Sequence, residues 1–147
     1  FEELMNQAIA EANLAAAKGE VPVGAVVSYK NQIISRAHNL VETDKDATAH
    51  AELLAIKEAS LTLQDWRLTE AVLCVTLEPC TMCAGAIRNS RIGTIIFGTN
   101  DPRLGALGSL YDISTDIRLG RCPRVVRGVC QDRCAALLKD FFSNLRA

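Results

Sequence analysis

Two short segments carry residues that can bind a metal ion or transfer protons. Residues 48–53 read TAHAEL and include His50 and Glu52, and residues 79–83 read PCTMC and include Cys80 and Cys83. Imidazole nitrogen and thiolate sulfur are common zinc ligands, and two cysteines three residues apart lie on one side of a helical turn. His50 and the two cysteines make three ligands. Because catalytic zinc sites keep a fourth position open, this count predicts a catalytic metal site.

Glu52 indicates the class of reaction at such a site. Positions i and i+2 of a regular helix point about 200° apart, so His50 and Glu52 can share a site only at an irregular helix end. A carboxylate beside a metal-activated water, and not itself a ligand, can act as general base and then as general acid. The alternatives are a structural Cys-x-x-Cys site, a redox dithiol, and a surface His-Ala-Glu without a function.

The elements that position these residues are predicted from hydrophobic periodicity and from turn residues. A hairpin is expected across Lys30-Asn31, a polar loop over 39–46, and Pro79 in the first turn of a helix. The simplest packing places helices on both faces of one sheet, so we predict a single α/β domain over residues 1–147, a three-layer α/β/α sandwich with a mixed sheet of about five strands. The expected helices are 2–18, 48–59, 79–89 and 132–145, and the expected strands are 23–28, 33–37, 73–77, 91–98 and 125–129.

Composition limits the setting in which the protein works. The sequence has 49% hydrophobic residues, no apolar run of about 18 residues, and no charged-then-apolar leader. We therefore expect a cytoplasmic protein without a membrane partner. In that compartment a Cys-x-x-Cys pair indicates metal binding or redox chemistry before a disulfide.

Charge is unevenly distributed along the chain. Residues 1–85 carry six Lys/Arg and twelve Asp/Glu, a net charge of −6, whereas residues 86–147 carry ten and five, a net charge of +5. A basic half can attract phosphate, and the alternative is a mixed solvated surface. The arginines at 118, 121, 124 and 127 belong to the basic half, but the sequence does not assign them to a face.

The two motifs, H-x-E at 50–52 and P-C-x-x-C at 79–83, resemble the signature of zinc-dependent nucleoside and nucleobase deaminases. Further blocks resemble bacterial tRNA-specific adenosine deaminases and cover most of the chain in order. GALGSL and CAALLKDFF are not expected in cytidine, guanine or riboflavin-pathway deaminases. The blocks are EVPVGAVV (20–27), DATAHAEL (46–53), VTLEPCTMCAGAI (75–87), SRIG (90–93), FGTND (97–101), GALGSL (105–110) and CAALLKDFF (134–142).

The resemblance implies a cytidine deaminase-like fold and hydrolytic deamination of adenosine to inosine at the wobble position of a tRNA anticodon. It implies one zinc ion per chain on His50, Cys80 and Cys83, with Glu52 taking a proton from water and delivering protons to the ring and to the departing amine. It also implies a homodimer in which both chains contribute to each site for the anticodon stem-loop.

The resemblance further assigns substrate contacts near the start of the zinc helix. Asn39 matches the base-recognising asparagine of the family, and a side-chain amide offers a purine edge both a donor and an acceptor. The backbone N–H of Ala51 is a further expected contact. The alternative for Asn39 is that it only stabilises a turn.

Contacts to the RNA backbone are expected from the basic half. The resemblance places the loop 99–110 against the anticodon loop, where Asp101 can accept a hydrogen bond from a ribose 2′-hydroxyl and Arg103 can bind phosphate. Phe142 and Arg146 on the last helix are expected to reach a flipped nucleotide or its phosphate. The alternatives are a flexible surface loop over 101–110 and a core position for Phe142.

Two other functions stay open from the sequence. One is a free nucleobase or nucleoside deaminase of the guanine or cytosine type on the same scaffold. The other is a zinc-stabilised RNA-binding protein without catalysis, against which Glu52 argues because a structural site does not need a general base.

Overall fold

The fold is built on one mixed five-stranded sheet, and the structure, a computed structural model, describes residues 1–146. The strand order is β2-β1-β3-β4-β5; β1 runs antiparallel to β2 and β3, while β3, β4 and β5 are parallel. Lys30 and Asn31 both have positive φ in the predicted hairpin turn. The strands are β1 (Gly24–Tyr29), β2 (Gln32–His38), β3 (Val72–Leu77), β4 (Thr94–Thr99) and β5 (Arg124–Val126).

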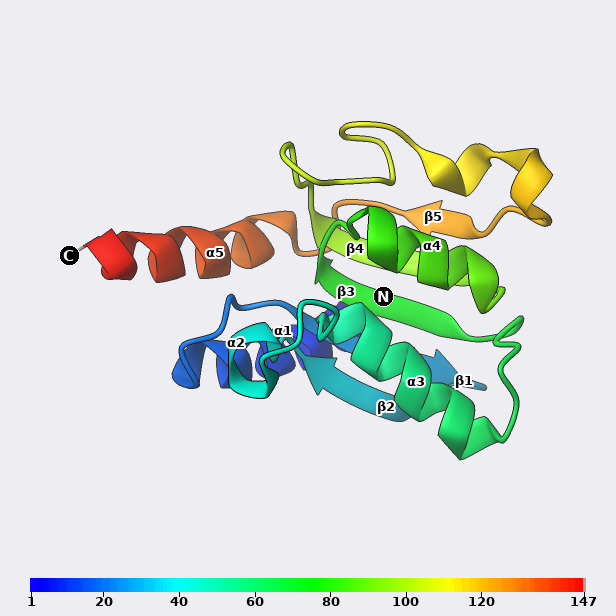
Figure 1. The fold of residues 1–147 in the computed structure, drawn as a ribbon, viewed down its shortest axis with the longest axis horizontal. Helices are drawn as coiled ribbons and strands as arrows, with labels where there is room; N and C mark the ends of the chain where they lie inside the picture. The colour runs from blue at the N-terminus through cyan, green and yellow to red at the C-terminus, as the bar shows by residue number, and fades with distance from the viewer. Residues whose placement is uncertain (147) are drawn as a thin grey trace.

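Helices cover both faces of the sheet (Figure 1). One face packs against α3 (Ala51–Leu63) and α4 (Thr81–Asn89), and the other packs against α1 (Glu2–Ala17) and α5 (Gln131–Arg146). Each face has its own cluster of buried apolar residues. The predicted three-layer α/β/α sandwich is therefore confirmed.

Small residues bring α3 close to the sheet. Ala51, Ala55 and Ala59 recur every four residues and are fully or almost fully buried. This spacing places the three methyl groups on one face of the helix, where larger side chains would hold the axis further away. The start of α3 is thereby fixed against the carboxyl end of β3.

Several predicted boundaries were wrong, and the backbone shows why. The helices expected from Thr48 and Pro79 begin at Ala51 and Thr81, because the residues before them are held in extended conformation or turns. The chain at Cys80 instead bridges Gly105. Within the expected loop 39–46 a short helix, α2 (Val41–Asp44), forms.

Two predicted strands are shorter than expected. Arg91 has φ 60°, so β4 cannot begin there and starts at Thr94. Gly128 has φ 76°, and β5 ends before it at Val126. Between β4 and β5 the chain forms two 3₁₀ turns, η1 (Ile113–Thr115) and η2 (Ile117–Leu119).

No helix in the part of the chain that the structure describes combines the length and the apolar character needed to cross a membrane.

Candidate active site

Two helix N-termini converge on the residues that the sequence singles out. His50 is the N-cap of α3 and Cys80 is the N-cap of α4, both with extended backbone, and Cys83 lies in the first turn of α4. The irregular helix end that His50 and Glu52 require is therefore present. The positive ends of both helix dipoles point toward this site and favour thiolate over thiol.

The side chains of His50, Cys80 and Cys83 lie close enough to hold one metal ion. His50 Nδ1 is 3.6 Å from Cys80 Sγ and 3.4 Å from Cys83 Sγ, and all three ligand atoms lie within 4.8 Å of one another. Tetrahedral zinc with a Zn–S bond of about 2.3 Å and a Zn–N bond of about 2.05 Å separates nitrogen from sulfur by about 3.6 Å. The three residues therefore fit a zinc ion and leave one coordination position for another ligand.

The pKa values of these three side chains are shifted in different directions. Hydrogen bonds from Cys83 and His50 lower the pKa of Cys80 to about 4, although burial opposes this shift. The hydrogen bond to Cys80 and burial both raise the pKa of Cys83. The hydrogen bond with Cys80 also raises the pKa of His50. The chain thus holds one thiolate before any metal binds, and full ligation requires loss of the Cys83 proton.

Glu52 lies in the first turn of α3, next to the three possible ligands, and is only 4% exposed. Burial raises the pKa of its carboxyl group to about 7. Cys80 contributes to the same direction, whereas His50 opposes it. A bound cation would lower this pKa again. A carboxyl group that can gain and lose a proton near neutral pH is suited to general acid–base catalysis.

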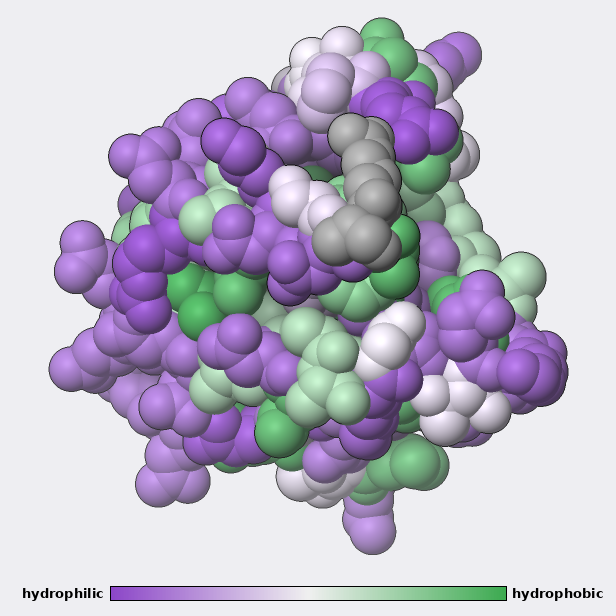
Figure 2. Space-filling view, turned by 90° about the vertical axis from the view of Figure 1, so that its left-hand side faces the viewer, coloured by the Kyte–Doolittle hydropathy of each residue, from purple (hydrophilic) through white to green (hydrophobic). Residues whose placement is uncertain are grey.

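A pocket of about 450 Å³ opens in front of Glu52. Its lining includes Leu77 at the carboxyl end of β3 and Ala51 at the start of α3. Figure 2 shows the side of the molecule that is on the left in Figure 1, where apolar patches lie among polar residues. His50, Glu52 and Cys80 line the pocket, whereas Cys83 is buried behind it. The predicted substrate residues that line the same pocket are Asn39, Ala51, Asp101, Arg103 and Phe142.

Asn39 is buried in the pocket wall, with 8% exposure. Its amide nitrogen donates to the Val21 carbonyl and its amide oxygen accepts from the Val41 N–H, both at 3.4 Å. The second of these bonds is the turn-stabilising contact that the sequence left open as an alternative. Both bonds are long for hydrogen bonds, so the amide is only weakly held by the protein.

Asp101 and Arg103 lie in the loop after β4. Asp101 Oδ1 accepts from the backbone N–H groups of Arg103 (3.0 Å) and Leu104 (3.2 Å), so the carboxylate shapes the turn that presents Arg103. The loop is anchored rather than free, which corrects the alternative of a flexible surface loop.

The last helix contributes an aromatic ring to the pocket. Phe142 is 43% exposed and meets Phe141 edge-on at 5.4 Å between ring centroids, so the alternative of a core position for Phe142 was wrong. Arg146 is the last residue of α5, and its side chain lies outside the described residues.

Sequence reasoning missed Glu78, which organises one wall of the pocket. Its buried carboxylate accepts from the backbone N–H groups of Asp101 (3.0 Å), Leu107 (3.0 Å) and Ser109 (3.1 Å), and from the Ser109 hydroxyl. Burial alone raises the pKa of Glu78, but these hydrogen bonds lower it below its ordinary value. A Cβ at Gly105 would overlap the carboxyl group, so the loop needs glycine there.

Glu20 plays the matching structural part on the opposite wall, and it too was missed. Its carboxylate is 1% exposed and accepts from Glu42 N (3.1 Å), Thr43 N (2.6 Å) and the Thr43 hydroxyl (2.5 Å). It therefore ties α2, next to Asn39, to the end of α1. Burial raises the pKa of Glu20, but the hydrogen bonds from Thr43 and Glu42 lower it below its ordinary value.

Comparisons with known proteins agree with this arrangement. The family described as MafB19-like deaminase matches residues 1–146. The tRNA-specific adenosine deaminase of Bacillus subtilis (strain 168) is 48% identical over 142 residues, which cover 97% of this chain and 88% of that protein. The chain belongs to the tRNA-specific adenosine deaminase family. Among solved structures, one from a study of A-to-I editing by tRNA:A34 deaminases at the wobble position of transfer RNA has a TM-score of 0.89 and 38% identity, and the match covers 92% of this chain and 99% of that one.

Deaminases outside the tRNA-specific adenosine deaminase family share the fold. A guanine deaminase from Nitrosomonas europaea has a TM-score of 0.81 with 22% identity, over 97% of this chain and 84% of that one. This likeness shows the scaffold alone. The predicted cytidine deaminase-like architecture is confirmed by both solved structures.

Proposed function

We propose that this protein deaminates adenosine to inosine in tRNA, at the wobble position of the anticodon. The observation that carries the proposal is the buried Glu52 beside a His-Cys-Cys group at the base of a pocket, in a chain whose relatives are named tRNA-specific adenosine deaminases. Hydrolytic deamination needs a water activated for attack on a ring carbon and a group that moves protons to the leaving amine.

His50, Cys80 and Cys83 would hold one zinc ion per chain. Zinc on three protein ligands supplies a strong nucleophile near neutral pH because it lowers the pKa of water. The side chains favour thiolate ligands before a metal binds, because the pKa of Cys80 is lowered to about 4 and both helix N-termini favour negative charge.

Glu52 would move the protons of the reaction. It would accept a proton from water and donate it to the adenine ring, and it would then carry the proton of the new C6 hydroxyl group to the amino group, which leaves as ammonia. Its burial supports this role, because the same low-dielectric surroundings that raise its pKa also keep bulk water from competing for the proton.

Asn39 and the Ala51 N–H would orient the base. The Asn39 amide makes two long hydrogen bonds to the protein, so it can turn its donor and acceptor to a purine edge at low cost. Ala51 is the first residue of α3, and its N–H is one of the backbone donors that a helix leaves unpaired.

The RNA around the flipped nucleotide would be held by four residues: Asp101, Arg103, Phe142 and Arg146. Asp101 would accept from a ribose 2′-hydroxyl, and Arg103 and Arg146 would contact phosphate. The exposed ring of Phe142 at the pocket rim offers a surface on which a base can stack.

A homodimer is the proposed assembly. Apolar side chains stay exposed along the segment between β4 and β5, which includes η2: Leu110 (53%), Tyr111 (46%), Ile117 (82%) and Leu119 (51%). Large apolar residues gathered on one segment are typical of an interface with another chain.

A tRNA substrate also implies that the protein works in the cytoplasm.

The test is a comparison of substrates. Purified zinc-loaded protein is incubated with tRNA transcripts, free adenosine, guanine and cytidine, and both ammonia release and A-to-I change are measured. We expect inosine only at a wobble adenosine. Ammonia from a free base with unchanged tRNA would instead support a nucleobase or nucleoside deaminase on this scaffold.

A further inference from the structure

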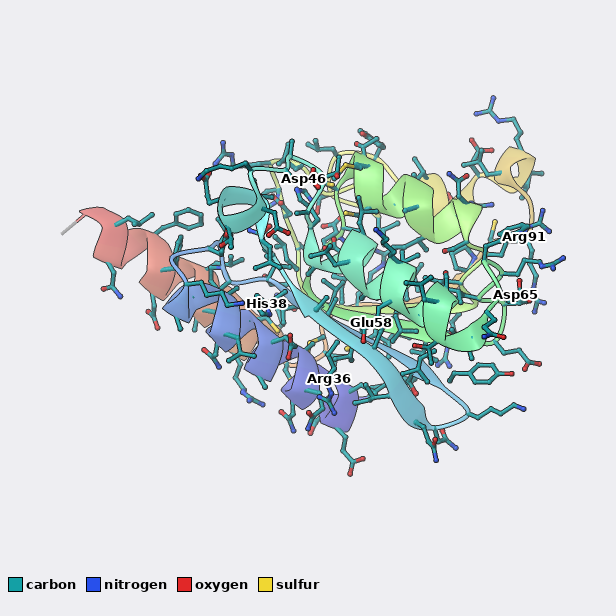
Figure 3. All side chains as sticks on the ribbon, turned by 60° about the horizontal axis from the view of Figure 1, so that its bottom comes forward. Arg36, His38, Asp46, Glu58, Asp65 and Arg91 are labelled. Atoms are coloured by element: carbon teal, nitrogen blue, oxygen red, sulfur yellow. The ribbon has the colours of Figure 1, made fainter. Side chains whose placement is uncertain are left out.

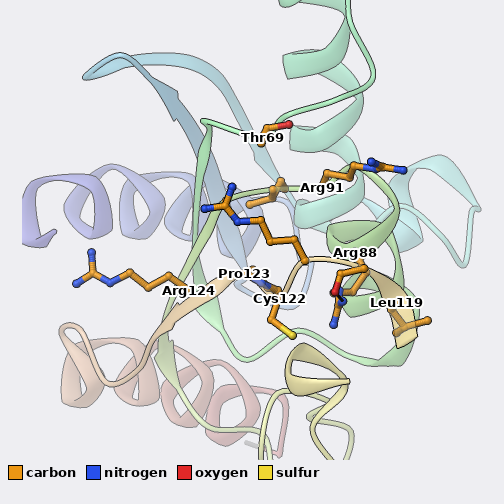
Figure 4. Close-up of a pocket in the computed structure, with 11 residues that line it drawn as sticks. Thr69, Arg88, Arg91, Leu119, Cys122, Pro123 and Arg124 are labelled. Carbon is orange, nitrogen blue, oxygen red and sulfur yellow. Dashed lines mark hydrogen bonds between the residues drawn. The ribbon is translucent and has the colours of Figure 1, made fainter. Parts of the chain in front are cut away.

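A second cavity, of about 430 Å³, lies at the end of α4 that is opposite to the metal-binding group (Figure 4). From the N-cap Cys80 to the last residue of α4, Asn89, the rise along the helix axis is about 14 Å, which separates the two sites. Four of the lining residues are arginines, and none is acidic: Arg88, Arg91, Arg121 and Arg124. These four residues and the cavity are called the arginine cavity below.

Arg88 builds the wall of the arginine cavity. Arg88 is only 7% exposed. Its guanidinium group donates to the carbonyls of Ile113 (2.8 Å), Ser114 (3.2 Å) and Gly120 (3.1 Å). It lies in the last turn of α4, where a cation also offsets the negative end of the helix dipole. Arg88 is thus explained by the fold, and it fixes the segment that carries Arg121 and Arg124.

The other three arginines make no such set of hydrogen bonds, although the guanidinium group of Arg124 lies 5.4 Å from the ring centroid of Phe1. Arg91, Arg121 and Arg124 are exposed, and within residues 1–146 no carboxylate lies within ion-pair distance of them. Two neighbouring arginines do have carboxylate partners, because Arg67 forms an ion pair with Asp65 and Arg118 forms one with Asp116. The nearby carboxylates of Asp65 and Asp116 are already paired, so positive charge at the cavity is in excess and attracts an anion.

An exposed tryptophan adjoins the arginine cavity. Trp66 is 54% exposed, and the guanidinium groups of Arg67 and Arg91 lie 5.2 Å and 5.5 Å from its ring centroid. Figure 3 shows Arg91 and Asp65 at one end of the molecule, away from Asp46. Exposed aromatic rings among arginines are typical of nucleic-acid-binding surfaces.

We propose that the arginine cavity binds backbone phosphates of the substrate RNA, outside the nucleotides that enter the active site. The inference rests on the proposed function, which supplies an RNA long enough to reach both ends of α4. A planar guanidinium binds phosphate through two parallel hydrogen bonds, so an exposed arginine at the cavity suits a phosphate better than a base edge. The side chains of Arg91 and Arg124 point in different directions (Figure 4), so each would contact a different phosphate. Such contacts position an RNA without reading its sequence.

The test removes charge from the arginine cavity without touching the active site. R91Q/R121Q is compared with R91K/R121K, which keeps both charges, and with K30Q/R36Q, which removes two charges from the β1–β2 edge. Equilibrium binding of full-length tRNA is measured over a range of salt concentrations, together with kcat and KM for deamination. Arg88 is left unchanged because the fold depends on it.

For R91Q/R121Q we expect Kd and KM for tRNA to rise about tenfold, and the slope of log K against log salt to fall by about 1 to 2. The lysine variant should keep the salt slope of wild type but recover only part of the affinity, because lysine keeps the charge and loses the two parallel hydrogen bonds. K30Q/R36Q should bind like wild type. A structural role alone would not change the salt slope.

Equal Kd and equal salt slope for R91Q/R121Q and wild type would overturn the inference while leaving deamination of tRNA in place. Failure of the proposed function is recognised separately, as tRNA that is bound but never deaminated. A thermal shift with inorganic pyrophosphate distinguishes a free phosphoanion: stabilisation of wild type but not of R91Q/R121Q, with tRNA binding unchanged, would also overturn the RNA assignment.

Discussion

Replacing Glu78 with glutamine tests how the pocket wall is built. Each carboxylate oxygen of Glu78 accepts two hydrogen bonds from the loop that carries Asp101, Leu107 and Ser109. Glutamine can place its amide nitrogen at the Oε1 position, where the Ser109 hydroxyl can accept from it, so the bond from the Asp101 N–H is lost and a donor faces a donor. At about 1.5–3 kcal/mol for the lost bond and about 1 kcal/mol for each of the two bonds that then reach a neutral acceptor, we expect a loss of about 3–5 kcal/mol in the free energy of unfolding.

The assay combines thermal unfolding with kinetics on an anticodon stem-loop. For a chain of 147 residues, the expected loss corresponds to a fall of roughly 10 °C or more in Tm. The loop that holds Asp101 should become looser, so KM for RNA rises. The matched control is Glu70→Gln, which makes the same chemical change at an exposed acid and should alter stability by less than about 0.5 kcal/mol.

The reasoning would be refuted if Glu78→Gln and Glu70→Gln had the same Tm as wild type and the same KM for RNA. Such a result would mean that the loop keeps its conformation without the carboxylate.

Three further results are expected. Cys83→Ser should reduce bound zinc to well below one ion per chain, and a chelator should lower the Tm of wild type but not of this variant. Asn39→Ala should lower kcat/KM by about a hundredfold with a change of less than about 1 kcal/mol in stability, measured by steady-state kinetics and denaturant unfolding; equal kcat/KM would exclude a role in base recognition. Glu20 has a folded-state pKa below its ordinary value of 4.5, so its stabilisation is present above that pH and lost as pH falls through the folded-state pKa. Glu20→Gln should therefore destabilise the protein at pH 7, by about 1–3 kcal/mol, and this difference should shrink as the pH is lowered below 4.5; a difference that stays constant as the pH is lowered would contradict this sign.

The grouping of His50, Cys80 and Cys83 beside Glu52 could be predicted because each of the two motifs depends on local spacing. Cys80 and Cys83 are three residues apart at a helix start, and His50 and Glu52 occupy the N-cap and first turn of another helix. The mixed sheet with helices on both faces also followed from the alternation of helices and strands, whereas the strand order was not predicted. Helix starts were harder, because the extended residues before α3 and α4 are fixed by distant contacts such as the bridge from Cys80 to Gly105.

Glu20 and Glu78 could not be recognised from the sequence. Glu20 lies two residues before Pro22, and Glu78 lies directly before Pro79. The hydrogen-bond partners of both acids lie 22 to 31 residues away along the chain. A position directly after an apolar strand was the only local signal at Glu78. The arginine cavity was hidden for the same reason, since Arg91 and Arg121 meet only after the chain between them has folded.

The central claim is that Glu52 transfers protons at a wobble adenosine. Its most direct test uses one anticodon stem-loop with adenosine at the wobble position and a second with that adenosine moved by one nucleotide, each incubated with zinc-loaded wild type and Glu52→Gln. We predict inosine only in the first RNA with wild type, and a rate at least about 10²-fold lower with Glu52→Gln at unchanged zinc content. Equal rates for wild type and Glu52→Gln would contradict the account, and so would inosine in both RNAs.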